Sequence, residues 1–232
     1  MDGLISLSGN TIAIALIGGI SPALFWLWFW LREDTVHPEP RGLIVLAFLA
    51  GMFVAPFALF PEQLAASWFG LHSVTSIVIW AVIEESLKLL AAYIGALHSK
   101  LVDEPIDPLM YMITAAIGFS ATENILFLLA PLHSGHFSEA LMLGSQRFIG
   151  ASLLHIICSA VIGLFLATSF HISKPRKVFH VVSGLFLAIA LHALFNLHII
   201  GEQGTGVFVT FSVVWFAAIL LMLAFEKVKQ MR

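Results

Sequence analysis

Two adjacent glutamates, Glu84 and Glu85, lie in the middle of an otherwise apolar stretch, residues 73–97, that is long enough to cross a bilayer. Lys88 follows one helical turn later in the same stretch. An ionised side chain near the bilayer centre costs about 2.5 to 3.5 kcal/mol on insertion scales, so such groups are tolerated when they face a polar cavity or one another. The pair therefore predicts a polar interior, with partners on other segments of the chain.

The rest of the chain has the composition of an integral membrane protein. Of its 232 residues, 59% are hydrophobic and 11% are charged, whereas roughly one quarter of the residues of a soluble domain are charged. Apolar runs long enough to span the bilayer occur at residues 11–31, 42–60, 73–97, 108–130, 143–169, 178–200 and 206–225. The sequence predicts an all-α membrane protein: a single domain over residues 1–232, built as a bundle of about seven transmembrane helices in a prokaryotic plasma membrane.

Basic residues are distributed unevenly between the predicted loops. They fall in the first, third and fifth loops and in the C-terminal tail, whereas the N-terminus and the other loops carry none. The residues concerned are Arg32, Arg41, Lys100, Lys174, Arg176, Lys177, Lys227, Lys229 and Arg232. By the positive-inside rule these segments are cytoplasmic, so the N-terminus is expected outside and the C-terminus inside the cell.

This topology assigns a depth to each polar residue within a predicted helix. At 1.5 Å per residue, Glu84 lies roughly 16 Å and Glu123 roughly 10 Å below the outer end of its helix. His155 and His192, in the next two helices, lie at roughly 18 and 12 Å. Four successive helices therefore carry an ionisable residue into one slab of the bundle, and we expect a catalytic core over about residues 73–200.

Further polar residues accompany this group. Asn124 follows Glu123 directly, while Ser159 and Asn196 each come four residues after a histidine and so share its helix face. A purely structural alternative pairs Glu84 with Lys88 at i,i+4 spacing, and Glu85 with Arg147 or a histidine. Such pairing accounts for only part of the cluster.

Histidines and carboxylates at one depth suit a divalent metal, with zinc the expected ion. A bound metal polarises a carbonyl and lowers the pKa of its water, while a free carboxylate acts as general base. Adjacent helical residues point about 100° apart, so of Glu84 and Glu85 one should act on the water and the other should bind or orient. This is the chemistry of peptide-bond hydrolysis.

Four sequence motifs occur in order on the four helices: Glu84-Glu85-Ser86-Leu87-Lys88 (EExxK), Phe119 to Asn124 (FxxxEN), a lone His155, and His192 to Asn196 (HxxFN). With these motifs, residues 80–200 resemble the PrsW family of membrane-embedded proteases, distant relatives of the prenyl-protein peptidases. Those relatives have histidine and arginine where this chain has Glu123 and Lys88. This difference argues against prenylated substrates.

The resemblance implies a glutamate-dependent, metal-dependent peptidase that acts on membrane-anchored proteins. Bacterial anti-sigma factors are the known kind of substrate in this family. It implies Glu84 as general base and Glu85 as its partner. From its position one turn after His192, Asn196 is expected to fix the His192 ring or to hold the substrate carbonyl and its developing oxyanion; the structural alternative is an interhelical hydrogen bond. The expected metal ligands are Glu123, His155 and His192, and the expected supporting residues are Lys88, Asn124, Arg147 and Ser159.

Two other functions fit the same residues. A proton- or cation-coupled transporter would use Glu84, Glu85, Glu123 and His192 as a relay, although the chain shows no internal repeat of the kind that many transporters contain. A catalytically silent protein would hold a membrane partner in the same cavity.

The expected partners are the lipid bilayer and a membrane-anchored protein substrate. No nucleic-acid partner is expected. The oligomeric state stays open.

Overall fold

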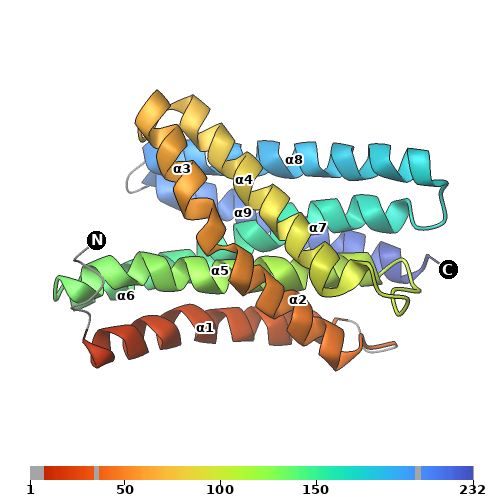
Figure 1. The fold of residues 1–232 in the computed structure, drawn as a ribbon, viewed down its shortest axis with the longest axis horizontal. Helices are drawn as coiled ribbons and strands as arrows, with labels where there is room; N and C mark the ends of the chain where they lie inside the picture. The colour runs from red at the N-terminus through yellow and green to blue at the C-terminus, as the bar shows by residue number, and fades with distance from the viewer. Residues whose placement is uncertain (1–7, 34–36, 202–204, 232) are drawn as a thin grey trace.

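The structure is a computed structural model that describes residues 8–33, 37–201 and 205–231. Within these ranges the chain forms helices and turns and contains no strand (Figure 1). The α-helices are α1 (Gly9–Leu31), α2 (Arg41–Val54), α3 (Pro56–Phe69), α4 (Val74–Ala92), α5 (Asp107–His133), α6 (Phe137–Gln146), α7 (Ser152–Thr168), α8 (Lys174–Gly201) and α9 (Thr205–Lys229). Two single-turn π-helices, η1 (Tyr93–Leu97) and η2 (Arg147–Ala151), continue α4 and connect α6 to α7.

The predicted all-α membrane fold is confirmed. Six helical stretches in the described part of the chain are long and apolar enough to span a membrane, and two of them, residues 41–69 and 137–168, join consecutive helices. The remaining predicted span, residues 73–97, corresponds to α4, which has 19 residues and carries Glu84, Glu85 and Lys88. The second predicted span ends too early, because helix α3 continues beyond residue 60 to Phe69.

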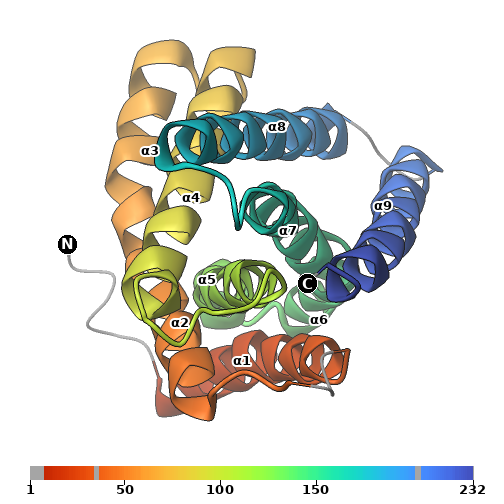
Figure 2. The same cartoon turned by 90° about the vertical axis from the view of Figure 1, so that its right-hand side faces the viewer.

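Helix α5 is the centre of the bundle. Figure 2 shows it enclosed by α1, α2, α4 and α7, and every residue from Asp107 to Ala121 is buried. Glycines allow α2 to cross α5 at close range: a Cβ atom on Gly51 would lie 2.0 Å from the carbonyl oxygen of Ala115, and one on Gly118 would lie 2.0 Å from that of Phe48. This small-residue packing is typical of membrane helices and fixes the helix that carries Glu123.

Helices α3 and α4 form a hairpin on one side of the bundle (Figures 1 and 2). Gly70 ends α3 with a φ of 94°, and Ser73 caps α4 by accepting a hydrogen bond from the backbone N–H of Ser76. The Ser76 hydroxyl donates to the Gly70 carbonyl at 2.7 Å, and the Trp80 indole donates to the Glu62 carbonyl at 2.9 Å. These bonds fix the register of the hairpin and hence the direction in which α4 presents its charged residues.

Candidate active site

The charged residues of α4 all point into the bundle. Glu84 is 6% exposed, while Glu85 and Lys88 are fully buried. Because adjacent residues of a helix point about 100° apart, the two carboxylates have different sets of neighbours. Glu84 lies near the imidazoles of both His155 and His192. Glu85 contacts Lys88 and the other nitrogen of His192. The expected divergence of the two glutamates is therefore present.

One oxygen of Glu84 is surrounded by nitrogen atoms. Its Oε2 lies 3.7 Å from Nδ1 of His155, 3.7 Å from Nε2 of His192 and 3.8 Å from Nζ of Lys88. This oxygen is buried and forms no hydrogen bond with any described residue. A buried carboxylate oxygen without a hydrogen bond is costly, so a cation or a water molecule bound beside this oxygen would be stabilising.

Glu85 holds both Lys88 and His192. Its Oε1 accepts a hydrogen bond from Lys88 Nζ at 2.5 Å and lies 2.7 Å from His192 Nδ1, and Ser159 Oγ lies 3.5 Å from its Oε2. Because a carboxylate can only accept, His192 carries its proton on Nδ1 and presents the lone pair of Nε2 towards Glu84. Glu85 thus determines the orientation and the tautomer of His192.

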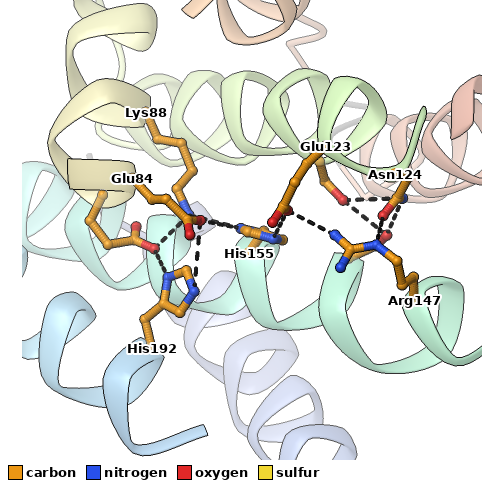
Figure 3. Close-up of polar contacts among 10 residues, drawn as sticks. Glu84, Lys88, Glu123, Asn124, Arg147, His155 and His192 are labelled. Carbon is orange, nitrogen blue, oxygen red and sulfur yellow. Dashed lines mark hydrogen bonds and ion pairs between the residues drawn. The ribbon is translucent and has the colours of Figure 1, made fainter. Parts of the chain in front are cut away.

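His155 joins the two halves of the site. Its Nδ1 lies 2.9 Å from Nζ of Lys88, and its Nε2 lies 2.7 Å from Oε2 of Glu123. An ammonium group can only donate and a carboxylate can only accept, so this arrangement assigns the ring proton to Nε2. Figure 3 shows the resulting row of side chains, from His192 and Glu84 through His155 to Glu123 and Arg147.

Arg147 fixes the far end of this row. Its terminal nitrogen lies 2.9 Å from Oε2 of Glu123, its Nε donates to Oδ1 of Asn124 at 2.6 Å, and its guanidinium stacks on Phe127 at 4.0 Å from the ring centre. The Asn124 amide in turn donates to the hydroxyl of Ser152 at 3.1 Å. Asn124 therefore acts through Arg147 and does not face Glu84.

The π-helix η2 begins at Arg147. A π-helix inserts one residue into the helical repeat, which rotates the flanking side chains relative to one another and disturbs the backbone hydrogen bonds. Two indoles compensate here: Trp26 of α1 donates to the Phe148 carbonyl at 3.2 Å, and Trp215 of α9 donates to the Ile149 carbonyl at 3.1 Å. Such bonds matter inside a bilayer, where water cannot replace them.

A cavity of about 830 Å³ gives access to this site. Its lining includes Glu84, Glu123, His155 and His192, and also His72 in the turn between α3 and α4. Much of its wall is apolar and includes Leu59, Leu126, Leu154, Phe195, Ile199 and Phe211. A mostly apolar cleft with a few convergent polar groups is typical of a ligand site.

The structure brings most of the predicted site residues together. Asn196 lines the same cavity one turn after His192, and within the described ranges its amide forms no hydrogen bond to protein. Both pairs of the structural alternative are also present: Glu84 with Lys88 at 3.8 Å, and Glu85 with a histidine, His192, at 2.7 Å. Arg147 pairs with Glu123 and not with Glu85.

One carboxylate of the cavity was not among the residues predicted from the sequence. Glu62 lines the cavity, but it lies beyond residue 60, where the predicted span ended. The apolar residues Leu64, Trp68 and Phe69, followed by Gly70 as a stop signal, are the pattern that extends the helix past Glu62.

The donor set suits a divalent metal. One carboxylate oxygen of Glu84 and one ring nitrogen each of His155 and His192 all lie within 4.8 Å of one another. Ligands at 2.0 to 2.2 Å from a tetrahedral zinc are roughly 3.3 to 3.5 Å apart, slightly closer than the two 3.7 Å separations at Glu84. Lys88 has to leave Nδ1 of His155 for that nitrogen to bind a metal. A second group of possible metal ligands, whose donor atoms also lie within 4.8 Å of one another, consists of Glu85, Cys158 and His192.

Comparison with known proteins agrees with this geometry. Residues 39–223 match the family described as PrsW family intramembrane metalloprotease. Bacterial proteins named Protease PrsW are similar to the chain. The one from Geobacillus kaustophilus is 24% identical over 91% of this chain and 89% of the relative. The one from Halalkalibacterium halodurans is 26% identical over 92% of this chain and 95% of the relative. The one from Bacillus subtilis is 27% identical over 68% of this chain and 67% of the relative.

No solved structure shows a significant match to the chain. The six apolar helices and the bacterial relatives identify a multi-pass bacterial membrane protein. Because the family match covers most of the chain, including α4 and the helices that supply Glu123, His155 and His192, the protein belongs to the PrsW protease family.

Proposed function

We propose that this protein is an intramembrane peptidase that hydrolyses a peptide bond of a membrane-anchored protein with the help of a divalent metal, most simply zinc. Family membership and the relatives named Protease PrsW support the proteolytic activity. Substrates similar to anti-sigma factors follow from the resemblance alone. The cavity, lined by apolar side chains above a charged base, suits an extended polypeptide segment.

One observation carries the proposal: Oε2 of Glu84 is buried, forms no hydrogen bond within the described chain, and lies 3.7 Å from a ring nitrogen of each of two histidines. A cation or a water molecule that binds between the three groups would supply the hydrogen bond or ligand bond that this oxygen lacks. Bound there, a divalent ion polarises the scissile carbonyl and acidifies the attacking water.

The geometry supports a particular division of labour between the carboxylates. Glu84, His155 and His192 form the compact ligand group, whereas the carboxylate of Glu123 lies on the opposite nitrogen of His155, held by Arg147. We therefore propose Glu84 as the carboxylate ligand and Glu123 as the carboxylate that orients His155, as Glu85 orients His192. The motifs instead suggested Glu123 as a ligand and Glu84 as the base. Glu85 positions His192 and is not in this ligand group.

Asn196 completes the proposed machinery. It lies one helical turn beyond His192 and lines the cavity, with its amide unused within the described chain. An amide N–H in this position donates a hydrogen bond to the substrate carbonyl and stabilises the negative charge that develops on its oxygen.

The proposal is tested by reconstituting the full-length protein with a single-span reporter protein and identifying new termini by mass spectrometry. Glu84→Gln is expected to lower the cleavage rate by at least about a hundredfold, in the range typical of lost acid–base or ligand groups. Glu139→Gln is the matched control, because Glu139 is exposed and pairs only with His136 on the surface. Normal cleavage by a folded Glu84→Gln protein would refute the assignment.

A further inference from the structure

Glu62 is a carboxylate in a membrane-spanning segment for which the proposed chemistry has no use. It lies on α3, is partly buried and lines the cavity. Among the described residues, no side chain forms an ion pair or hydrogen bond with its carboxylate. An ionisable residue within a membrane segment is a functional candidate when nothing in the fold pairs with it.

The other charged groups around the cavity already have partners. Arg147 pairs with Glu123 at 2.9 Å, and Lys88 pairs with Glu85 at 2.5 Å. Neither cation forms an ion pair with Glu62; at longer range Lys88 attracts its carboxylate and Glu123 repels it. The wall of the cavity at α3 is thus acidic, and it attracts a cation that enters from outside the fold.

The position of Glu62 relative to the candidate active site is fixed by the α3–α4 hairpin. The Trp80 indole donates to the Glu62 carbonyl at 2.9 Å, and Trp80 precedes Glu84 by one helical turn on α4. Glu62 is therefore joined to the turn of α4 that precedes Glu84, and both carboxylates lie on the wall of one cavity. A substrate segment bound in this cavity can contact Glu62 through a side chain close to the bond that lies at Glu84.

We propose that Glu62 forms a specificity subsite that binds a lysine or arginine side chain of the substrate near the scissile bond. The inference rests on the proposed peptidase function and adds a substrate preference to it. A basic side chain supplies the partner that the fold does not provide, and a charge-assisted hydrogen bond contributes about tenfold or more to substrate selection.

The test uses the purified full-length protein and a defined mixture of synthetic peptides that presents every residue type on both sides of each bond. Cleavage sites are ranked by kcat/KM from mass spectrometry for wild type, Glu62→Gln and Glu62→Lys. Gln63→Lys is the matched control, since it adds the same charge to the neighbouring, exposed position of α3. Thermal unfolding in detergent verifies that each variant is folded.

Wild type is expected to prefer peptides with lysine or arginine near the cleaved bond. Glu62→Gln should lose this preference: kcat/KM for basic peptides should decrease by about tenfold or more, while kcat/KM for neutral peptides stays the same. Glu62→Lys should shift the preference to aspartate and glutamate, and Gln63→Lys should behave as wild type.

The outcomes separate this inference from the function on which it rests. Cleavage without a basic preference, or with one that Glu62→Lys leaves unchanged, overturns the subsite alone. The absence of any cleavage by wild type, both here and with the single-span reporter, overturns the peptidase proposal and the subsite with it.

Discussion

Nδ1 of His192 lies 2.7 Å from the Glu85 carboxylate, and Nε2 of the same ring lies 3.7 Å from Oε2 of Glu84. The two neighbouring glutamates of α4 thus act on opposite sides of one imidazole. A carboxylate behind a histidine fixes the ring and makes its other nitrogen a better metal ligand. This relationship gives Glu85 a positioning role that differs from that of Glu84.

Replacing Glu85 with glutamine should weaken metal binding without removing a ligand. We expect the zinc dissociation constant to rise about 10- to 100-fold, as for other residues that orient metal-binding histidines, measured by competition with a chelating dye. Ser159→Ala is the control, because its hydroxyl lies 3.5 Å from Glu85 and makes at most a weak contact. Equal zinc affinity in wild type and Glu85→Gln would contradict the role of Glu85.

Metal content distinguishes the two possible roles of Glu84 and Glu123. If Glu84 is the ligand, Glu84→Gln loses bound zinc and activity together, whereas Glu123→Gln keeps the three ligands and binds zinc more weakly. Elemental mass spectrometry of the purified variants measures the metal directly. Zinc lost from Glu123→Gln and kept by Glu84→Gln would restore the assignment that the sequence motifs suggested.

Lys88 is expected to contribute strongly to stability. It is fully buried and its ammonium lies 2.5 Å from Glu85 and 3.8 Å from Glu84. Lys88→Met leaves these carboxylates without their cation, and removal of one partner of a buried ion pair costs about 3 to 5 kcal/mol. Thermal unfolding in detergent should show a large decrease in Tm.

A second substitution tests whether charge is the cause of this loss. The double variant Glu85→Gln/Lys88→Met removes both members of the pair and should recover part of the lost Tm. A double variant as unstable as the two single variants combined would indicate that packing dominates at this position.

The indole of Trp26 should affect catalysis from outside the cavity. Trp26→Phe keeps an aromatic ring but leaves the Phe148 carbonyl in the π-helix without its donor, at a cost of about 1 to 3 kcal/mol. We expect Arg147 to be less well positioned and kcat to decrease more than KM changes. Trp28→Phe on the same helix is the control, because Trp28 is 51% exposed. Equal losses in both variants would show that the effect is not specific to η2.

The orientation in the membrane is a further prediction from the distribution of basic residues. In a Cys158→Ser background, a membrane-impermeant thiol reagent applied to intact cells should label Ser8→Cys and not Met231→Cys. Permeabilised cells should show labelling of both, which controls for reactivity. The reverse pattern would place the turn between α3 and α4, with His72, on the cytoplasmic side.

The sequence alone determined the class of fold, because a bilayer allows few alternatives. Apolar runs near 20 residues have to become spanning helices, and the structure confirms this all-α architecture. The cluster of Glu84, Glu123, His155 and His192 could also be anticipated, since helices of known rise and alternating direction assign each residue a depth. Depth is a one-dimensional quantity that a sequence encodes directly.

The tertiary structure decided what depth cannot specify, namely the direction of each side chain around its helix axis. Only packing placed Glu85 behind His192 and Glu123 beside Arg147, because the rotation of each helix depends on contacts such as Gly118 against Phe48. The π-helix at Arg147 likewise depends on neighbouring segments. The sequence therefore determines which polar groups share a level in the membrane, and the fold determines which of them meet.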